Sequence, residues 1–186
     1  MAGRRIPGAL AAAVAVAAIG ACAVTTAAAP AATGSVRAPA AERIATLEQG
    51  VLAAVNDVRR AHHLEPLKQS ARLDRAAADH SREMGQAGFF SHDSADGSEF
   101  WKRVQSFYPS KSWSYWSVGE NLLWASPDID AAGAVKLWME SPEHRANLLA
   151  GRWREIGLSA LRVPAAPGAF HGLDVTIVTA DFGVRR

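Results

Sequence analysis

Three side chains in this sequence have the types and positions expected of a chemical site: His92, Glu120 and His144. Each histidine lies in a polar stretch beside an expected element boundary, where a scaffold presents side chains to a cleft. Glu120 is an acid within an otherwise apolar segment, and leaving it buried without a partner would cost roughly several kcal/mol. Glu120 therefore needs a fixed partner, and a histidine is the natural one.

His144 is predicted to lie in the first turn of a helix, because Ser141 suits the N-cap and Pro142 the first helical position. The positive end of the helix dipole disfavours imidazolium and keeps the ring neutral, as a metal ion or a general base requires. The three residues match no short metal motif, so a structural hydrogen-bonded network is the alternative to a shared site. The other four histidines are expected to be structural: His62 and His80 on core-facing stripes, His63 at a helix end and His171 in a loop.

The elements that must position these residues follow from apolar spacing. Helical periodicity predicts four helices, over about 44–62, 71–87, 100–108 and 131–141, with a short fifth helix after Pro142. Ser70 and Asp128 or Asp130 are the expected caps, and Gly88 is placed to end the second helix. Residues 109–117 are predicted to be loop and 118–125 a short strand. Period-two alternation predicts strands over 156–161 and 175–180, joined by a loose hairpin over 164–172. Helices followed by an antiparallel pair indicate an α+β domain with helices covering a sheet.

Composition fits one ordinary globular domain. The chain has 186 residues, of which 49% are hydrophobic, and a single cysteine, so disordered, collagenous and multi-domain classes are disfavoured. The formal net charge is +2, but residues 1–41 hold three basic residues and no acid, which leaves residues 42–186 at −1. The domain therefore lacks the positive charge that attracts nucleic acid, and we expect no nucleic-acid partner and a monomer.

The amino-terminal segment is typical of a targeting signal. Arg4 and Arg5 precede an uncharged, alanine-rich run that is short for a membrane span. We assign residues 1–24 to a signal peptide, 25–41 to a flexible tether and 42–186 to the domain. Small residues before Cys22 fit a lipoprotein signal that would make Cys22 the lipidated first residue, whereas cleavage within 27–32 would give a free secreted protein. The protein is thus expected to be secreted or attached to the cell envelope, meeting the membrane only through the signal or a lipid on Cys22.

Four ordered blocks carry a resemblance to a known family. They are Phe90-Ser91-His92, Gly119-Glu120-Asn121, the stretch from Trp138 to Leu149, and Glu155-Ile156-Gly157-Leu158. In this order and spacing they resemble the CAP superfamily, also called the SCP domain, which groups cysteine-rich secretory, antigen 5 and pathogenesis-related proteins. The compact bacterial branch, which lacks disulfides, is the most similar. The resemblance covers about residues 47–183.

The resemblance implies an α-β-α sandwich with a small antiparallel sheet covered by helices. It also implies a cleft lined by two histidines and two acids, often around zinc or another divalent cation. His92, Glu120 and His144 match the two histidines and the first acid, a set that suits zinc with an open position. Glu140 is the candidate for the second acid. It lies one residue before the position usual in the family, which Ser141 holds here, and one helical residue turns a side chain by about 100°.

Two functions remain open. The first is a binding module for an envelope lipid, glycan or protein, supported by the export signal and by aromatic residues in the loop 113–116. The second is a zinc-dependent hydrolase or protease in which His92 and His144 hold the metal and Glu120 is a ligand or general base. We favour binding, because the sequence has no His-Glu-x-x-His helix, no Gly-x-Ser-x-Gly elbow and no catalytic cysteine in the domain.

Overall fold

The structure is a computed structural model that describes residues 40–186. The predicted signal peptide, Cys22 and all of the predicted tether except residues 40–41 lie outside the described residues. No helix in this described part is long and apolar enough to span a membrane.

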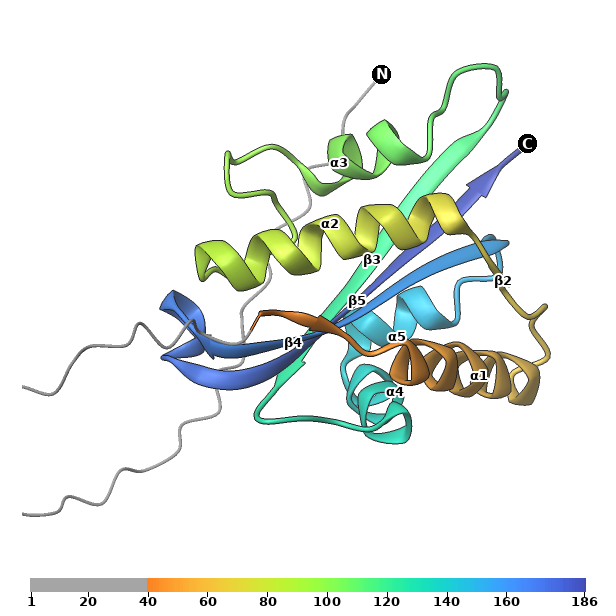
Figure 1. Cartoon of the computed structure of the whole chain (residues 1–186). Coiled ribbons are helices and arrows are strands. Elements are labelled where there is room, and N and C mark those ends of the chain that lie inside the picture. Colours follow the sequence, from red (N-terminus) through yellow and green to blue (C-terminus); the bar gives the residue numbers. More distant parts are fainter. Residues whose placement is uncertain (1–39) are drawn as a thin grey trace, which may run out of the picture. The chain divides into compact units, whose positions relative to one another are not determined.

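One twisted sheet forms the centre of the domain (Figure 1). Its strands are β1 (Glu42–Arg43), β2 (Lys68–Gln69), β3 (Trp116–Ala125), β4 (Glu155–Ala166) and β5 (Leu173–Arg185). The order is β1-β4-β5-β3, with antiparallel pairing throughout, and β2 adds a short parallel pairing to β4. The strand β3 therefore forms one edge of the sheet.

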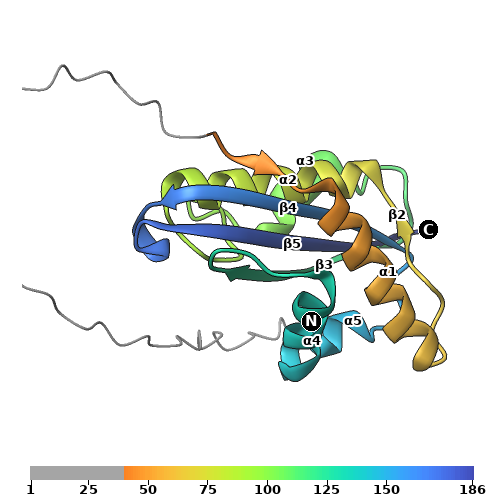
Figure 2. The same ribbon diagram turned by 60° about the horizontal axis from the view of Figure 1, so that its bottom comes forward.

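Helices cover both faces of the sheet (Figures 1 and 2). The helices α2 (Ala71–Ala87) and α3 (Phe100–Phe107) lie on one face. The helices α1 (Ala45–Ala61), α4 (Ala131–Glu140) and α5 (Pro142–Leu148) lie on the other, and a single 3-10 turn, η1 (Gly168–Phe170), joins β4 to β5. The predicted α+β fold, an α-β-α sandwich, is confirmed.

The side chains of β3 alternate between the two helical layers. Leu122 packs with Met84 of α2, whereas Leu123 belongs to the cluster that contains Val51 of α1 and Trp138 of α4. Because successive side chains of a strand point to opposite faces, Glu120 shares the α2–α3 face and its neighbours Gly119 and Asn121 share the other. One strand thus supplies contacts to both layers.

Local signals set the helix ends largely as predicted. Gly88 ends α2 in the left-handed conformation with φ 72°. Asp130 caps α4, since its carboxylate accepts a hydrogen bond of 2.7 Å from the Gly133 backbone. Ser70 and Ser141 occupy the N-cap positions of α2 and α5, but neither side chain makes a cap hydrogen bond.

Three sequence predictions need correction. His62 is exposed instead of facing the core, because α1 ends at Ala61 and helical periodicity no longer applies. The strand β3 starts at Trp116, inside the predicted loop, because its first residues pair with the end of β5. Pairing of β4 with β5 also resumes after an irregularity between Val163 and Ala166, which shortens the predicted hairpin loop. The two-residue strands β1 and β2 were not predicted, since two residues show no periodicity.

Candidate functional site

Glu120 is the centre of the candidate site and is almost completely enclosed. Its side chain is 1% exposed, on the edge strand β3. One carboxylate oxygen, Oε1, accepts a hydrogen bond of 2.8 Å from His92 Nδ1, and the other, Oε2, accepts one from Arg103 Nη2. Burial alone would raise the pKa of Glu120, but the His92 hydrogen bond and the Arg103 charge outweigh burial and lower it. Glu120 is therefore an ionised carboxylate with both oxygens bound.

His92 is the accessible member of this pair. Its side chain is 44% exposed, and its Nδ1 must carry a hydrogen because its partner is an ionised carboxylate. The other ring nitrogen, Nε2, has no hydrogen-bond partner in residues 40–186. The contact with Glu120 thus fixes the ring and leaves Nε2 for an outside group.

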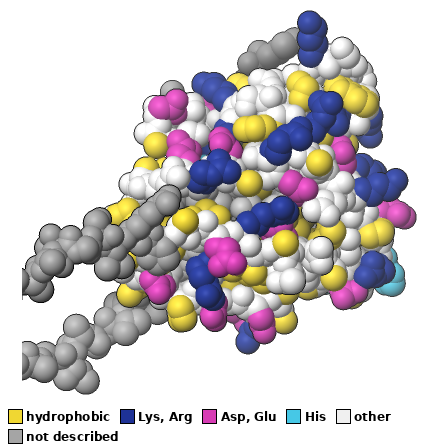
Figure 3. Space-filling model, in the orientation of Figure 1, with side chains coloured by type: hydrophobic (Ala, Val, Ile, Leu, Met, Phe, Trp, Pro, Cys, Tyr) yellow, Lys and Arg dark blue, Asp and Glu magenta, His cyan; other side chains and the backbone are white. Residues whose placement is uncertain are grey.

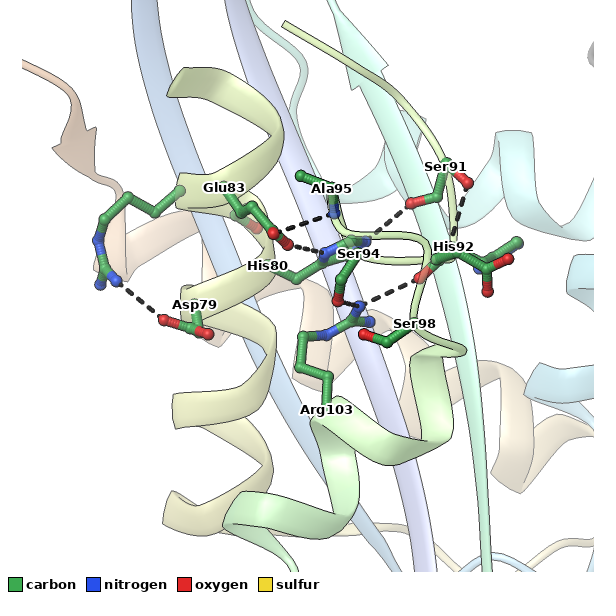
Figure 4. Close-up of polar contacts among 12 residues, drawn as sticks. Asp79, His80, Glu83, Ser91, His92, Ser94, Ala95, Ser98 and Arg103 are labelled. Atoms are coloured by element: carbon green, nitrogen blue, oxygen red, sulfur yellow. Dashed lines mark hydrogen bonds and ion pairs between the residues drawn. The ribbon is translucent and has the colours of Figure 1, made fainter. Parts of the chain in front are cut away.

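Arg103 of α3 ties the His92 loop to the sheet (Figure 4). Besides Glu120, its guanidinium donates hydrogen bonds of 3.1 Å to the His92 carbonyl and 3.2 Å to Ser94 Oγ. The side chain is only 5% exposed. One buried arginine therefore neutralises Glu120 and positions the backbone that carries His92.

Two residues of α2 hold the same loop from the other side (Figure 4). The buried His80 donates through Nε2 to the Ser91 carbonyl at 2.8 Å, and Glu83 accepts a hydrogen bond of 3.0 Å from the Ala95 backbone. Desolvation lowers the pKa of His80 although nearby Glu120 opposes it, so the ring is neutral at pH 7. The predicted structural role of His80 thus serves the candidate site.

Asp181 is a second acid, directly opposite Glu120 on the neighbouring strand β5. The two residues are register partners on β3 and β5, and Asp181 is completely buried. Neither of its carboxyl oxygens has a hydrogen-bond partner among the described residues. Burial and the negative charge of Glu120 raise the pKa of Asp181 well above its usual value, against the opposing effect of Arg103. Asp181 is therefore a neutral carboxyl group beside an ionised one.

His144 lies on α5, which is fastened to β3 and α1 through its backbone. Asn121 donates 3.0 Å to the His144 carbonyl, and Asn147 donates 3.1 Å to the Glu120 carbonyl. The buried Arg59 donates 2.7 Å to the Leu148 carbonyl at the end of α5. The Gly119-Glu120-Asn121 motif thus sends its acid into the site and its amide to the helix that carries His144.

The His144 ring is half-buried and makes no side-chain hydrogen bond in the described part of the chain. Desolvation lowers its pKa, and the neighbouring His92 lowers it further. Of the two imidazoles, only that of His92 makes a hydrogen bond with Glu120. The predicted neutral state of His144 agrees with this direction.

Glu140 does not join the other three residues. Its side chain is 61% exposed and lies 3.9 Å from Lys136 on the same helix. The physical reason is the one-residue offset from the family position, because Trp138 occupies the inward face of α4 and turns Glu140 to solvent.

Sequence reasoning kept Glu140 as a candidate and missed Arg103 and Asp181. Arg103 is one of two adjacent basic residues on a short amphipathic helix, and nothing in its spacing distinguishes it from Lys102.

The donor set does not fit a divalent cation in this arrangement. Among residues 40–186, no three His, Cys, Asp or Glu side chains lie close enough together to hold a metal. Both Glu120 oxygens are bound, one by a positively charged guanidinium that would repel a cation. The predicted ligand set of His92, Glu120 and His144 therefore stays a prediction.

A hollow of about 500 Å³ lies in the segment that carries His92. Phe89, Ser91, Asp93 and Ser94 are among the residues that line it. Hydroxyl and carboxylate groups beside an aromatic ring are suited to hydrogen-bonding a small polar ligand.

Comparisons with known proteins agree on one family. The family model described as "Cysteine-rich secretory protein family" (CAP) matches residues 52–181, more than half of the chain. A curated relative, the uncharacterized protein YkwD of Bacillus subtilis (strain 168), is 29% identical over 115 residues. This match covers 62% of this chain but only 42% of that protein.

Solved structures show the same fold. An extracellular SCP-domain protein from Bacillus anthracis str. Ames matches with TM-score 0.58 and 25% identity, over 76% of this chain and 41% of that one. An outer surface protein from Borrelia burgdorferi matches with TM-score 0.58 and 20% identity, over 79% of this chain and 100% of that one. A cysteine-rich secretory protein from Staphylococcus aureus subsp. aureus Mu50 matches with TM-score 0.54 and 17% identity, over 75% of this chain and 39% of that one.

Proposed function

The chain belongs to the cysteine-rich secretory protein (CAP) family, and we propose that it is an extracytoplasmic binding module whose ligand contacts His92 and His144. The observation that carries this proposal is the state of Glu120. Both of its carboxylate oxygens accept hydrogen bonds, one from His92 and one from Arg103. Glu120 therefore has a structural role in the site instead of a reactive one. What the site offers to a ligand is the two imidazole rings, together with the hollow lined by residues on either side of His92 in the sequence.

The ligand chemistry that best fits is a glycan. A His92 ring held through Nδ1 offers Nε2 to a hydroxyl group, and Ser91, Asp93 and Ser94 add hydroxyl and carboxylate oxygens. Sugar hydroxyls donate and accept in such a setting without bringing a charge.

Calorimetric titration with soluble amino-sugar oligosaccharides of the cell wall tests this function. We expect His92→Gln and His144→Gln each to weaken binding about tenfold, the loss of one or two hydrogen bonds. Glu140→Gln is the matched control, because Glu140 is exposed and paired only with Lys136. Equal affinity in all four proteins, or no binding by the wild type, would remove the glycan assignment.

A zinc-dependent hydrolase remains the alternative function. It requires His92, Glu120 and His144 to meet at one ion, which here means displacing Arg103 from Glu120. Metal analysis after saturation with zinc decides between the two functions. About one equivalent of zinc, lost in both His92→Ala and His144→Ala, would favour the hydrolase. We expect no retained equivalent in the wild type.

The location of the protein is also part of the proposal. Two of the similar structures are of proteins described as extracellular and outer surface, and residues 1–24 are typical of an export signal. We propose export, followed either by lipidation of Cys22 as an anchor or by cleavage within residues 27–32 and release of a free protein. With the lipid anchor, Cys22→Ser should move the protein from the membrane fraction to the medium, and unchanged partitioning would exclude the lipid anchor.

A further inference from the structure

Aromatic and basic side chains gather at one end of the sheet, away from the candidate site. Figure 3 shows hydrophobic and basic side chains together at the upper right, where Figure 1 places the α3–β3 loop and the end of β5. We call this surface the aromatic–basic patch; it consists of Lys111, Trp113, Tyr115, Arg185 and Arg186.

The two aromatic rings of the patch are exposed yet held in place. Trp113 is 46% exposed and Tyr115 is 38% exposed. The Arg185 guanidinium lies 5.2 Å from the Trp113 ring centre, and that of Arg186 lies 4.7 Å from the Tyr115 ring centre. These cation–π contacts cover one face of each ring and leave large apolar areas in water.

Backbone pairing makes the patch a fixed surface. Tyr115 and Arg186 exchange two backbone hydrogen bonds, of 2.8 and 3.1 Å, and Ser114 Oγ donates 2.7 Å to the Arg186 carbonyl. The loop is therefore fastened to the end of β5. Ordering the rings in advance lowers the conformational entropy that binding would cost.

The charge of the patch is only partly neutralised within the described residues. Arg185, whose side chain is 15% exposed, forms an ion pair with Glu155, at 3.8 Å from Arg185 Nε. Lys111 and Arg186 are exposed and form no ion pair in residues 40–186. A partner for this surface must therefore supply negative charge and tolerate apolar rings.

The aromatic–basic patch is separate from the Glu120 site. Trp116, which pairs with Arg185, precedes Glu120 on β3 by four residues, about 13 Å of strand. A partner on the patch thus need not touch His92 or His144.

We propose that the aromatic–basic patch docks the domain on a membrane surface with anionic headgroups. Tryptophan and tyrosine concentrate at the membrane–water interface, because their rings are apolar and their polar atoms stay hydrated. Lysine and arginine beside them are attracted to anionic lipid. The patch combines both features on one rigid edge, and this charge complementarity selects an anionic lipid surface over a neutral one.

Vesicle binding of the full chain tests the proposal, with Cys22→Ser in every protein so that acylation plays no part. The probes are phosphatidylcholine vesicles with and without phosphatidylglycerol. We expect tighter binding to the anionic vesicles, weakening as salt rises. Lys111→Gln with Arg186→Gln should lower anionic binding about 25-fold, since each basic residue contributes about fivefold. Neither side chain is buried, so folding should be unaffected.

Tryptophan emission gives a second, local measurement. Anionic vesicles should shift the emission of the wild type to shorter wavelength, and Trp113→Phe should remove most of that shift, although the chain has six tryptophans. A shift that survives in Trp113→Phe would place the contact elsewhere and overturn the proposal.

Matched controls separate this surface from general effects. Arg60→Gln with Lys136→Gln removes two exposed charges outside the patch, one on α1 and one on α4. Leu137→Ser removes an apolar side chain that is 49% exposed. Both controls should bind anionic vesicles like the wild type. His92→Gln should do so too, because a loss of glycan binding in that variant tests only the proposed function. Equal losses in the charge-matched control would overturn the proposal. So would equally tight binding to soluble polyphosphate, which would indicate a polyanion site.

Discussion

Glu120 carries a negative charge in a place that water does not reach, so its stability depends on Arg103. Removing one partner of a buried ion pair leaves the other charge uncompensated. We expect Arg103→Met to lower the free energy of unfolding by about 3–5 kcal/mol, measured by urea denaturation. The double variant with Glu120→Gln should recover a large part of the loss, since no charge is then left unpaired. Additive losses would contradict this pairing.

Asp181 should respond differently although it lies beside Glu120. Its carboxyl group is already neutral in the folded protein, because burial and Glu120 raise its pKa well above the usual value. Asp181→Asn replaces one neutral group by another of similar size, and we expect its unfolding free energy at pH 7 to change by less than about 1 kcal/mol. A loss as large as that of Arg103→Met would show that Asp181 is ionised.

His80 predicts a dependence of stability on pH. The folded protein binds a proton on His80 less readily than the unfolded chain, whose histidines have the ordinary pKa of 6.5. Below pH 6.5 the unfolded state therefore takes up the proton first, and the unfolding free energy falls until the lowered folded pKa is reached. His80→Gln should flatten this fall between about pH 7 and pH 5 in thermal unfolding, more than His144→Gln, whose ring is only half-buried. If stability fell with pH as steeply in His80→Gln as in the wild type, this prediction would be wrong.

At this scale, sequence reasoning predicted that Glu120 has a histidine partner, and His92 takes that place in the structure. An acid in an apolar segment must have a partner, and that argument needs no coordinates. It did not find Arg103, because an arginine beside a lysine on a short amphipathic helix gives no signal of its own. It did not exclude Glu140, because the direction of a residue at the end of a helix depends on packing.

Among the contacts between helices and strands, the one between α2 and β4 depends on Gly157. A Cβ on Gly157 would lie 2.0 Å from the Leu73 carbonyl carbon and 2.2 Å from the Asp74 nitrogen, which are backbone atoms that cannot move alone. We expect Gly157→Ala to lower the unfolding free energy by more than about 3 kcal/mol, by separating a helix from its strand. Gly151→Ala is the control, since its Cβ would meet only Leu64 at 3.6 Å. Chemical denaturation of both variants checks this, and similar stabilities would argue against the close packing.

Helices were predicted more accurately than strands, for a physical reason. Long amphipathic helices such as α1 and α2 repeat an apolar signal over several turns, and their caps mark the ends. The lengths of β3, β4 and β5 instead depend on pairing with partners distant in the chain. Sequence periodicity shows that a strand exists but not where its pairing stops.

The described residues form one compact unit around the sheet. Its hydrophobic clusters join helices of both layers to the central strands. We expect a fragment of residues 40–186 to unfold in one cooperative transition with a normal denaturant dependence. Circular dichroism during urea denaturation measures this. A broad, non-cooperative transition would mean that residues before 40 contribute to the core.

The order of the strands also has a consequence for how the protein is made. Every described strand pairs with β4 or β5, which come last along the chain. Until the ribosome has synthesised these two strands, the sheet therefore lacks its central members, and β1, β2 and β3 have nothing to pair with. Contacts of such large sequence separation form slowly. The nascent chain therefore cannot complete this sheet before the ribosome has made its last described strand.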